Sequence, residues 1–89
     1  MKLSIITPEN KIYEDEIKRF IFTAIDGEIE IQDKHCDLIT VIDNCQATIF
    51  QEHSKKEINL SGGLCKVKNN ELYILTTKAE FLNNIKANS

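Results

Sequence analysis

The sequence lacks the features that mark membrane-spanning, secreted and disulfide-stapled proteins. No uninterrupted apolar stretch in its 89 residues approaches the roughly 18 residues that a membrane span needs. The first residues lack the apolar h-region and the cleavage site of a signal peptide. The three cysteines, Cys36, Cys45 and Cys65, are odd in number, widely spaced and without a C-x-x-C pair, which indicates reduced thiols. We therefore expect a chain that is made and kept in the cytosol, with no direct membrane insertion.

The chain also lacks an excess of basic residues. Lys and Arg number 11 against 14 Asp and Glu, which gives a formal net charge of −3. Such a balance provides no global attraction for nucleic acid or for an anionic membrane, so neither is an expected partner. Hydrophobic residues make up 42% and charged residues 28%, as in an ordinary soluble domain. A chain of this length is expected to form one domain with a single modest core.

Period-two alternation of apolar and polar residues dominates the chain, and it is typical of β-strands. The predicted strands cover residues 3–7, 15–24, 28–31, 38–42, 47–51, 57–60, 64–68 and 72–77. Turn residues separate them at short intervals, and no helical stretch of ten or more residues intervenes. The pattern predicts an all-β fold, an antiparallel β-sandwich of two sheets with about eight to ten short strands.

The end of the chain departs from this pattern. Across residues 78–85, the side chains of Phe81, Leu82 and Ile85 would share one face of a helix. We therefore expect a domain over residues 1–80, followed by a short helical turn or frayed tail over residues 81–89.

Two of the three glycines, Gly62 and Gly63, stand side by side between two strand-like runs. A phosphate loop would need G-x-x-x-x-G-K-[ST] before a helix, whereas the residues after Gly63 alternate as a strand. We interpret the pair as a tight corner or bulge, where a positive φ or the close approach of another backbone excludes a Cβ.

Two further groups of residues could carry chemistry. His35 and Cys36 are adjacent, but the paired ligand spacing of a zinc site and the signature of a nucleophilic thiol are both missing. Glu28 and Glu30 would point from one strand face, where a solvated surface or a contact with a basic partner is favoured over acid/base catalysis. We predict no catalytic residue, no cofactor and no metal.

Three separated segments resemble one known family. They read "MKLSIITPENKIYEDEI", "IDGEIEIQDKHCDLIT" and "INLSGGLCKVKNNELYILTTKAE". In order and spacing they are similar to the N-terminal β-sandwich of the epsilon subunit of F-type ATP synthases. That family's pattern runs K-L-x-I-x-T/S-P, then G-E-[LI]-x-[IV]-x-x-x-H-x-x-[LI]-[LI]-T, then S-G-G, and it ends in T-x-x-A-E. The resemblance covers residues 1–80 and leaves out the C-terminal helical hairpin that many members carry.

The resemblance implies a noncatalytic rotor part. Epsilon subunits lie at the foot of the central stalk and bind the gamma subunit and the ring of membrane-embedded c subunits, which couples proton translocation to ATP synthesis. The implied location is peripheral, at the cytoplasmic face of the inner or plasma membrane. The implied contacts with the c ring are Glu28, Ile29, His35 and Thr40, and those with the gamma subunit are Leu38, Ile39, Ser61, Gly62 and Gly63. A free-standing β-sandwich that binds a small ligand is the alternative.

Overall fold

The computed structural model describes residues 1–24 and 27–82. In these residues there are ten strands and no helix. The strands are β1 (Lys2–Ile6), β2 (Lys11–Glu16), β3 (Arg19–Ala24), β4 (Gly27–Gln32), β5 (Leu38–Ile42), β6 (Cys45–Phe50), β7 (Lys55–Leu60), β8 (Gly63–Lys68), β9 (Glu71–Thr76) and β10 (Ala79–Phe81).

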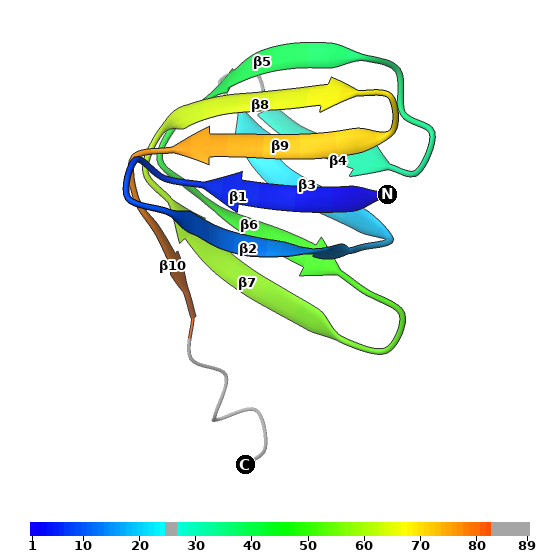
Figure 1. Ribbon diagram of the computed structural model, residues 1–89, viewed down its shortest axis with the longest axis horizontal. Coiled ribbons are helices and arrows are strands. Elements are labelled where there is room, and N and C mark those ends of the chain that lie inside the picture. The colour runs from blue at the N-terminus through cyan, green and yellow to red at the C-terminus, as the bar shows by residue number, and fades with distance from the viewer. Residues whose placement is uncertain (25–26, 83–89) are drawn as a thin grey trace.

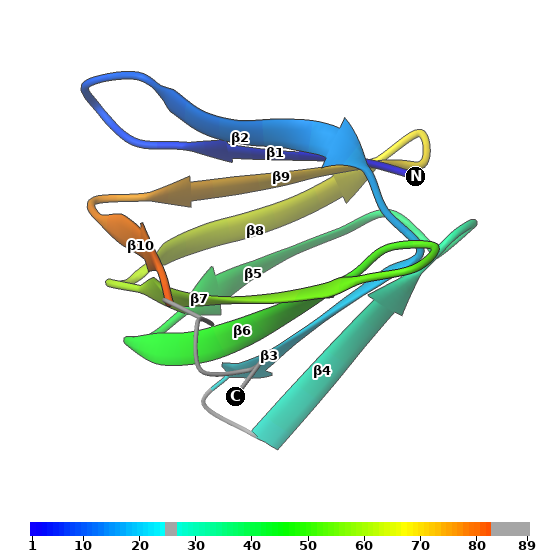
Figure 2. The ribbon, with the colours of Figure 1, turned by 90° about the horizontal axis from the view of Figure 1, so that it is seen from below.

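The strands form two five-stranded sheets that pack face to face (Figures 1 and 2). Sheet A has the order β2-β1-β9-β8-β5, and sheet B has the order β10-β7-β6-β3-β4. All neighbouring strands are antiparallel except β1 and β9, which run parallel and are far apart in the sequence. The predicted all-β sandwich of two sheets is confirmed, with this one parallel pair as the departure from a purely antiparallel arrangement.

The core lies between the two sheets, where every second side chain of a strand points inward. Phe20 and Phe22 of β3 are its largest side chains, and each is at most 1% exposed. The other core residues are Met1, Leu3, Ile5, Ile17, Ile31, Ile42, Ala47, Ile49, Ile58, Leu60, Cys65, Val67, Leu72 and Ile74. Both sheets contribute to this one layer, and dense packing of this kind gives a stiff body.

The single strand predicted over residues 15–24 is wrong, because the chain changes sheets within it. β2 ends in sheet A before Ile17, and β3 begins in sheet B after Lys18. The Ile17 N–H donates to the carbonyl of Met1 at 2.9 Å, whereas the Lys18 N–H donates to the carbonyl of Phe50 at 2.7 Å. Consecutive residues are thus hydrogen-bonded to opposite sheets, and a buried Ile17 marks the crossing instead of a turn residue.

The helix predicted over residues 78–85 is also wrong where the structure describes it. Ala79–Phe81 form β10, which pairs antiparallel with β7. The Leu82 N–H then donates to the carbonyl of Glu57 at 2.9 Å, which continues the contact with β7. Residues 83–85 lie outside the described residues, and the division into a domain and a tail at residue 80 stays a prediction.

Candidate protein-contact surfaces

The chain passes from sheet B to sheet A at the glycine corner, which comprises Ser61, Gly62 and Gly63. Gly62 has a φ of +68° and Gly63 a φ of +143°, which side chains rarely adopt. A Cβ added to Gly63 would lie 1.9 Å from the carbonyl oxygen of Leu75 in β9. The Thr76 hydroxyl donates to the Gly62 carbonyl at 2.7 Å and ties the corner to β9. The predicted tight corner, with positive φ and a close backbone, is confirmed.

The four residues expected at the c ring lie along one side of the sandwich. β4 and β5 are edge strands of opposite sheets, and residues 33–37 connect them. Glu28 is exposed on β4, and His35 is half-buried in the connecting loop. Ile29 packs against the core, and Thr40 is half-buried between exposed neighbours on β5. Of the four, Glu28 is exposed, and the other three are half-buried.

The residues expected at the gamma subunit lie at the two ends of β5. Leu38 packs against the core, whereas Ile39 is 66% exposed on the outer face of sheet A. Ile42, the last residue of β5, pairs with Gly63. The glycine corner thus adjoins the end of β5 that is remote from Leu38, so this strand connects all members of the set.

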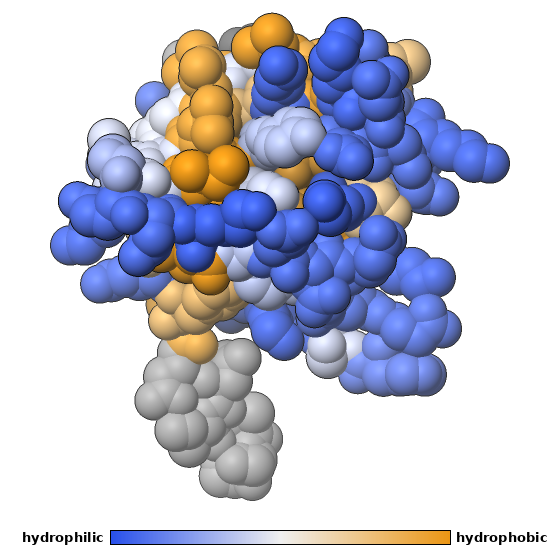
Figure 3. Space-filling model, in the orientation of Figure 1, coloured by the Kyte–Doolittle hydropathy of each residue, from blue (hydrophilic) through white to orange (hydrophobic). Residues whose placement is uncertain are grey.

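An apolar strip, formed by Ile39, Val41, Leu64 and Leu75, crosses the outer face of sheet A. Val41 pairs with Leu64 and Leu64 with Leu75, so three adjacent strands contribute to it. Ile39 and Val41 are 66% and 54% exposed, and the other two are about 40% exposed. Figure 3 shows hydrophobic side chains running across this face. Clustered apolar side chains of this kind mark protein-contact sites.

Sequence reasoning identified only Ile39 of this strip. Alternation indicates that Leu64 and Leu75 point away from the core, but it is ambiguous for Val41, because residues 38–42 are apolar on both faces of their strand. It does not show that β5, β8 and β9 are neighbours, because that depends on the strand order of the folded sheet.

The outer face of sheet A changes from apolar to charged toward its other edge. Lys2 of β1 lies 3.1 Å from Glu14 of β2, and Lys11 also pairs with that carboxylate. The hydrogen bonds from Lys11 and Lys2 hold the pKa of Glu14 below its usual range. The charged side chains at this edge pair with one another and remain in water. The apolar strip is therefore the part of this face that a partner protein could cover at least cost.

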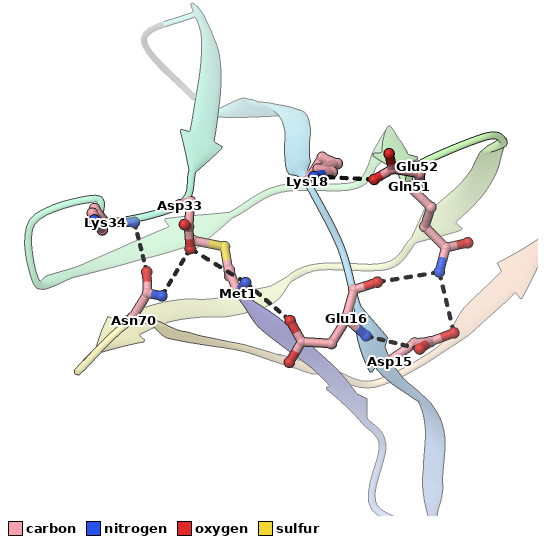
Figure 4. Close-up of polar contacts among 9 residues, drawn as sticks. All are labelled: Met1, Asp15, Glu16, Lys18, Asp33, Lys34, Gln51, Glu52 and Asn70. Atoms are coloured by element: carbon pink, nitrogen blue, oxygen red, sulfur yellow. Dashed lines mark hydrogen bonds and ion pairs between the residues drawn. The ribbon is translucent and has the colours of Figure 1, made fainter.

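A polar network holds the end of the sandwich where the loop of residues 33–37 lies (Figure 4). Asn70 accepts a hydrogen bond from the Lys34 N–H at 2.6 Å and donates one to Asp33 at 2.8 Å. The Met1 amine lies 3.3 Å from the same Asp33 oxygen and 3.2 Å from a Glu16 oxygen. The hydrogen bonds from Asn70 and from the Met1 amine lower the pKa of Asp33.

The cysteines and His35 show no shared chemistry. Burial raises the pKa of Cys65 to about 12, so its thiol stays protonated and is a poor nucleophile. Cys36 is exposed and Cys45 is half-buried. The His35 Nδ1 lies 2.8 Å from the Cys36 carbonyl oxygen. Among residues 1–24 and 27–82, no three His, Cys, Asp or Glu side chains converge in an arrangement that could hold a metal ion.

The chain is a small two-sheet β-sandwich with an exposed apolar strip on the outer face of one sheet. Residues 1–82 match the family described as ATP synthase, Delta/Epsilon chain, beta-sandwich domain, and the chain belongs to this family. In the part of the chain that the structure describes, there is no helix long and apolar enough to cross a membrane.

Curated relatives carry the name ATP synthase epsilon chain. One from Clostridium kluyveri is 37% identical over 83 residues, which cover 91% of this chain and 62% of the relative. One from Helicobacter pylori is 28% identical over 82 residues, which cover 92% of this chain and 67% of the relative. The chain therefore spans about three fifths to two thirds of the length of these relatives.

Solved structures share the fold at low sequence identity. A chain in the Tetrahymena thermophila mitochondrial ATP synthase central stalk and c-ring structure superposes with a TM-score of 0.78 at 17% identity, covering 89% of this chain and 64% of that chain. A chain in the Euglena gracilis mitochondrial ATP synthase structure reaches 0.83 at 18% identity, covering 94% and 56%. At these identities the likeness concerns the fold alone.

Proposed function

We propose that this chain is a noncatalytic rotor subunit of an ATP synthase, which links the gamma subunit to the c ring. Rotation driven by proton translocation would pass through it toward the sites of ATP synthesis. Membership of the family supports this role, since the curated relatives are ATP synthase epsilon chains. The observation that carries the proposal is the apolar strip on the outside of a densely packed sandwich, because a coupling part needs a stiff body and a surface for a neighbour.

The gamma subunit would bind the side formed by β5 and the glycine corner. Leu38, Ile39, Ser61, Gly62 and Gly63 would lie at or near this contact. Among the residues that the structure describes, Ile39 is the most exposed of the large apolar ones, and the strip extends from it over β8 and β9. Exposed apolar side chains that become buried at the centre of an interface commonly supply most of its affinity.

The c ring would bind the side formed by β4 and the loop of residues 33–37. Glu28 and His35 would make direct contacts there, and the exposed Glu28 carboxylate suits basic or polar loop residues of the ring. Ile29 and Thr40 would support this edge from within the sandwich. Such a contact would place the chain peripherally, at the cytoplasmic face of the inner or plasma membrane.

A pull-down from membranes of the source cell, with the tagged full chain as bait, tests the gamma contact. The double variant Ile39→Ser/Val41→Ser is expected to recover at least about tenfold less gamma subunit, because it removes two exposed apolar side chains from the strip. Its free energy of unfolding should change by less than about 1 kcal/mol, because both side chains are on the surface.

Ile12→Ser is the matched control for this experiment. Ile12 is 37% exposed on β2, at the edge of sheet A opposite β5, so its replacement should leave the recovery of gamma subunit unchanged. Equal recovery with the wild type and the double variant would count against the strip as the contact. A monomeric wild-type chain that captures no gamma subunit and carries a small ligand would favour the free-standing ligand-binding sandwich instead.

A further inference from the structure

Two segments from distant parts of the sequence meet at the end of the sandwich that carries Met1 (Figure 4). Residues 33–37 connect β4 of sheet B to β5 of sheet A, and Asn69 and Asn70 form the turn between β8 and β9. Three hydrogen bonds join the loop to the turn across sequence separations of 32 to 37 residues. The shape of the loop therefore depends on a turn in another part of the chain.

Asn70 makes two of these bonds with opposite ends of its amide. Its Oδ1 accepts from the Lys34 N–H at 2.6 Å, and its Nδ2 donates to Asp33 Oδ1 at 2.8 Å. Because an N–H needs an acceptor and a carboxylate needs a donor, these partners fix the orientation of the amide. The Asn69 N–H donates the third bond to Asp37 Oδ1 at 3.2 Å. Both ends of the loop are thus tied to one turn.

The bond to Lys34 holds a residue in an unfavourable backbone conformation. Lys34 has a φ of 65°, in the left-handed region where lysine is uncommon. Asn69 and Asn70 also have positive φ values, 52° and 62°, but asparagine tolerates this region well. Such a conformation persists where surrounding contacts stabilise it. Two hydrogen bonds do so for Lys34: its own N–H donates to Asn70, and the His35 N–H donates to the Gln32 carbonyl at 3.1 Å, which closes a turn around it.

We propose that Asn70 is a positioning residue, which braces the loop of residues 33–37 and so presents His35 to the c ring. This inference rests on the proposed function, because it takes the loop to face the ring. A loop fixed before binding loses less conformational entropy on binding than a loose one. The amide atoms of Asn70 bind the loop and not the ring. Their removal would therefore weaken the contact between the loop and the c ring without deleting a side chain that touches the ring.

Asn70→Gly tests the brace without straining the turn. Glycine adopts positive φ freely, so the substitution removes the bridging amide and preserves the backbone. Asn69→Gly is the matched control, because it changes the same turn at a similar φ and keeps the backbone N–H that binds Asp37. Stability of both variants is measured first, to establish that they fold.

The first readout is hydrogen exchange of the Lys34 amide in the full chain. We expect it to become about tenfold faster in Asn70→Gly, because the amide loses its acceptor, and to stay unchanged in Asn69→Gly. A wild-type exchange rate in Asn70→Gly would overturn the brace. An equal acceleration in the two variants would overturn it as well, since the backbone of the turn would then be responsible.

The second readout is the recovery of c and gamma subunits with the tagged full chain from membranes. Asn70→Gly should lower the recovery of c subunits about fivefold relative to gamma, and Asn69→Gly should leave both unchanged. Unchanged c-subunit recovery in a variant with faster Lys34 exchange would overturn the positioning role. A wild-type chain that captures neither subunit would refute the proposed function instead, and the exchange measurement would still decide whether Asn70 braces the loop.

Discussion

Substitutions at two glycines, Gly27 and Gly63, would distinguish the free-energy cost of backbone strain from the cost of a steric clash. Gly27, with a φ of +124°, has no atom within 4 Å of an added Cβ, whereas at Gly63 the Leu75 carbonyl oxygen is 1.9 Å away. We expect Gly27→Ala to lower the free energy of unfolding by about 1 kcal/mol through strain alone. Gly63→Val should lower it by at least about 3 kcal/mol, because β9 must also move. Urea unfolding measures both, and equal losses would contradict the close approach of β9.

Single residues also show what the sequence could and could not reveal. The residue type at Gly62 and Gly63 indicates their backbone conformation, because glycine adopts positive φ without a steric cost. Lys34 gives no such signal. Its left-handed conformation is stabilised by a hydrogen bond to Asn70, which is 36 residues away and becomes a neighbour only in the folded chain. The corner was therefore predictable, and the brace on the loop was not.

Whole strands were predictable where alternation and turn residues coincide, and the errors have physical causes. Between β2 and β3 the chain crosses from one sheet to the other through the buried Ile17, with no glycine or proline to mark the change. In Ala79–Phe81 three residues are too few for periodicity to distinguish a strand from a helix, and the pairing with β7 decides the outcome. The apolar strip needed the strand order as well, since its members come from three strands.

The strands β2 and β10 close the side of the sandwich opposite β4 and β5. The rings of Tyr13 and Phe81 lie 5.6 Å apart there, measured between centroids. The Tyr13 hydroxyl is buried, and within the described residues it has no hydrogen-bond partner. Because the charged form is disfavoured by burial, the pKa of Tyr13 is raised. The Tyr13 ring thus packs this edge, but its buried hydroxyl without a partner lowers the stability of the fold.

Tyr13→Phe should remove that cost and keep the packing. We expect the free energy of unfolding to rise by up to about 1 kcal/mol, because an unpaired buried hydroxyl no longer has to be stripped of water. Tyr13→Ala is the control, and its lost ring contacts should lower stability by about 3 kcal/mol. Thermal unfolding of both variants measures the two effects. A less stable Tyr13→Phe protein would mean that the hydroxyl has a partner after all.

For the molecule as a whole, the shared core predicts that the two sheets unfold together. Both tyrosines, Tyr13 of β2 and Tyr73 of β9, belong to sheet A, and the chain has no tryptophan. Because the Tyr13 ring contacts Phe81 of β10 in sheet B, fluorescence is read in the Tyr13→Phe background, where Tyr73 of sheet A is the remaining tyrosine. Far-ultraviolet circular dichroism reports on both sheets. Ile58 of β7 is fully buried in sheet B and Leu72 of β9 in sheet A, so each can be truncated to perturb one sheet from its inner face.

Ile58→Ala should lower the fluorescence-detected midpoint as much as the circular dichroism midpoint, although the substitution lies in the sheet without tyrosines. The free energy of unfolding should fall by about 2–5 kcal/mol, as it should for Leu72→Ala, because each substitution leaves a cavity in the one core between the sheets. A fluorescence midpoint that stays at the value of the Tyr13→Phe background would mean that the sheets unfold separately. That result would also count against the proposed rotor role. In that role, torque is transmitted between the apolar strip of sheet A and Glu28 of sheet B, and it must pass through this core.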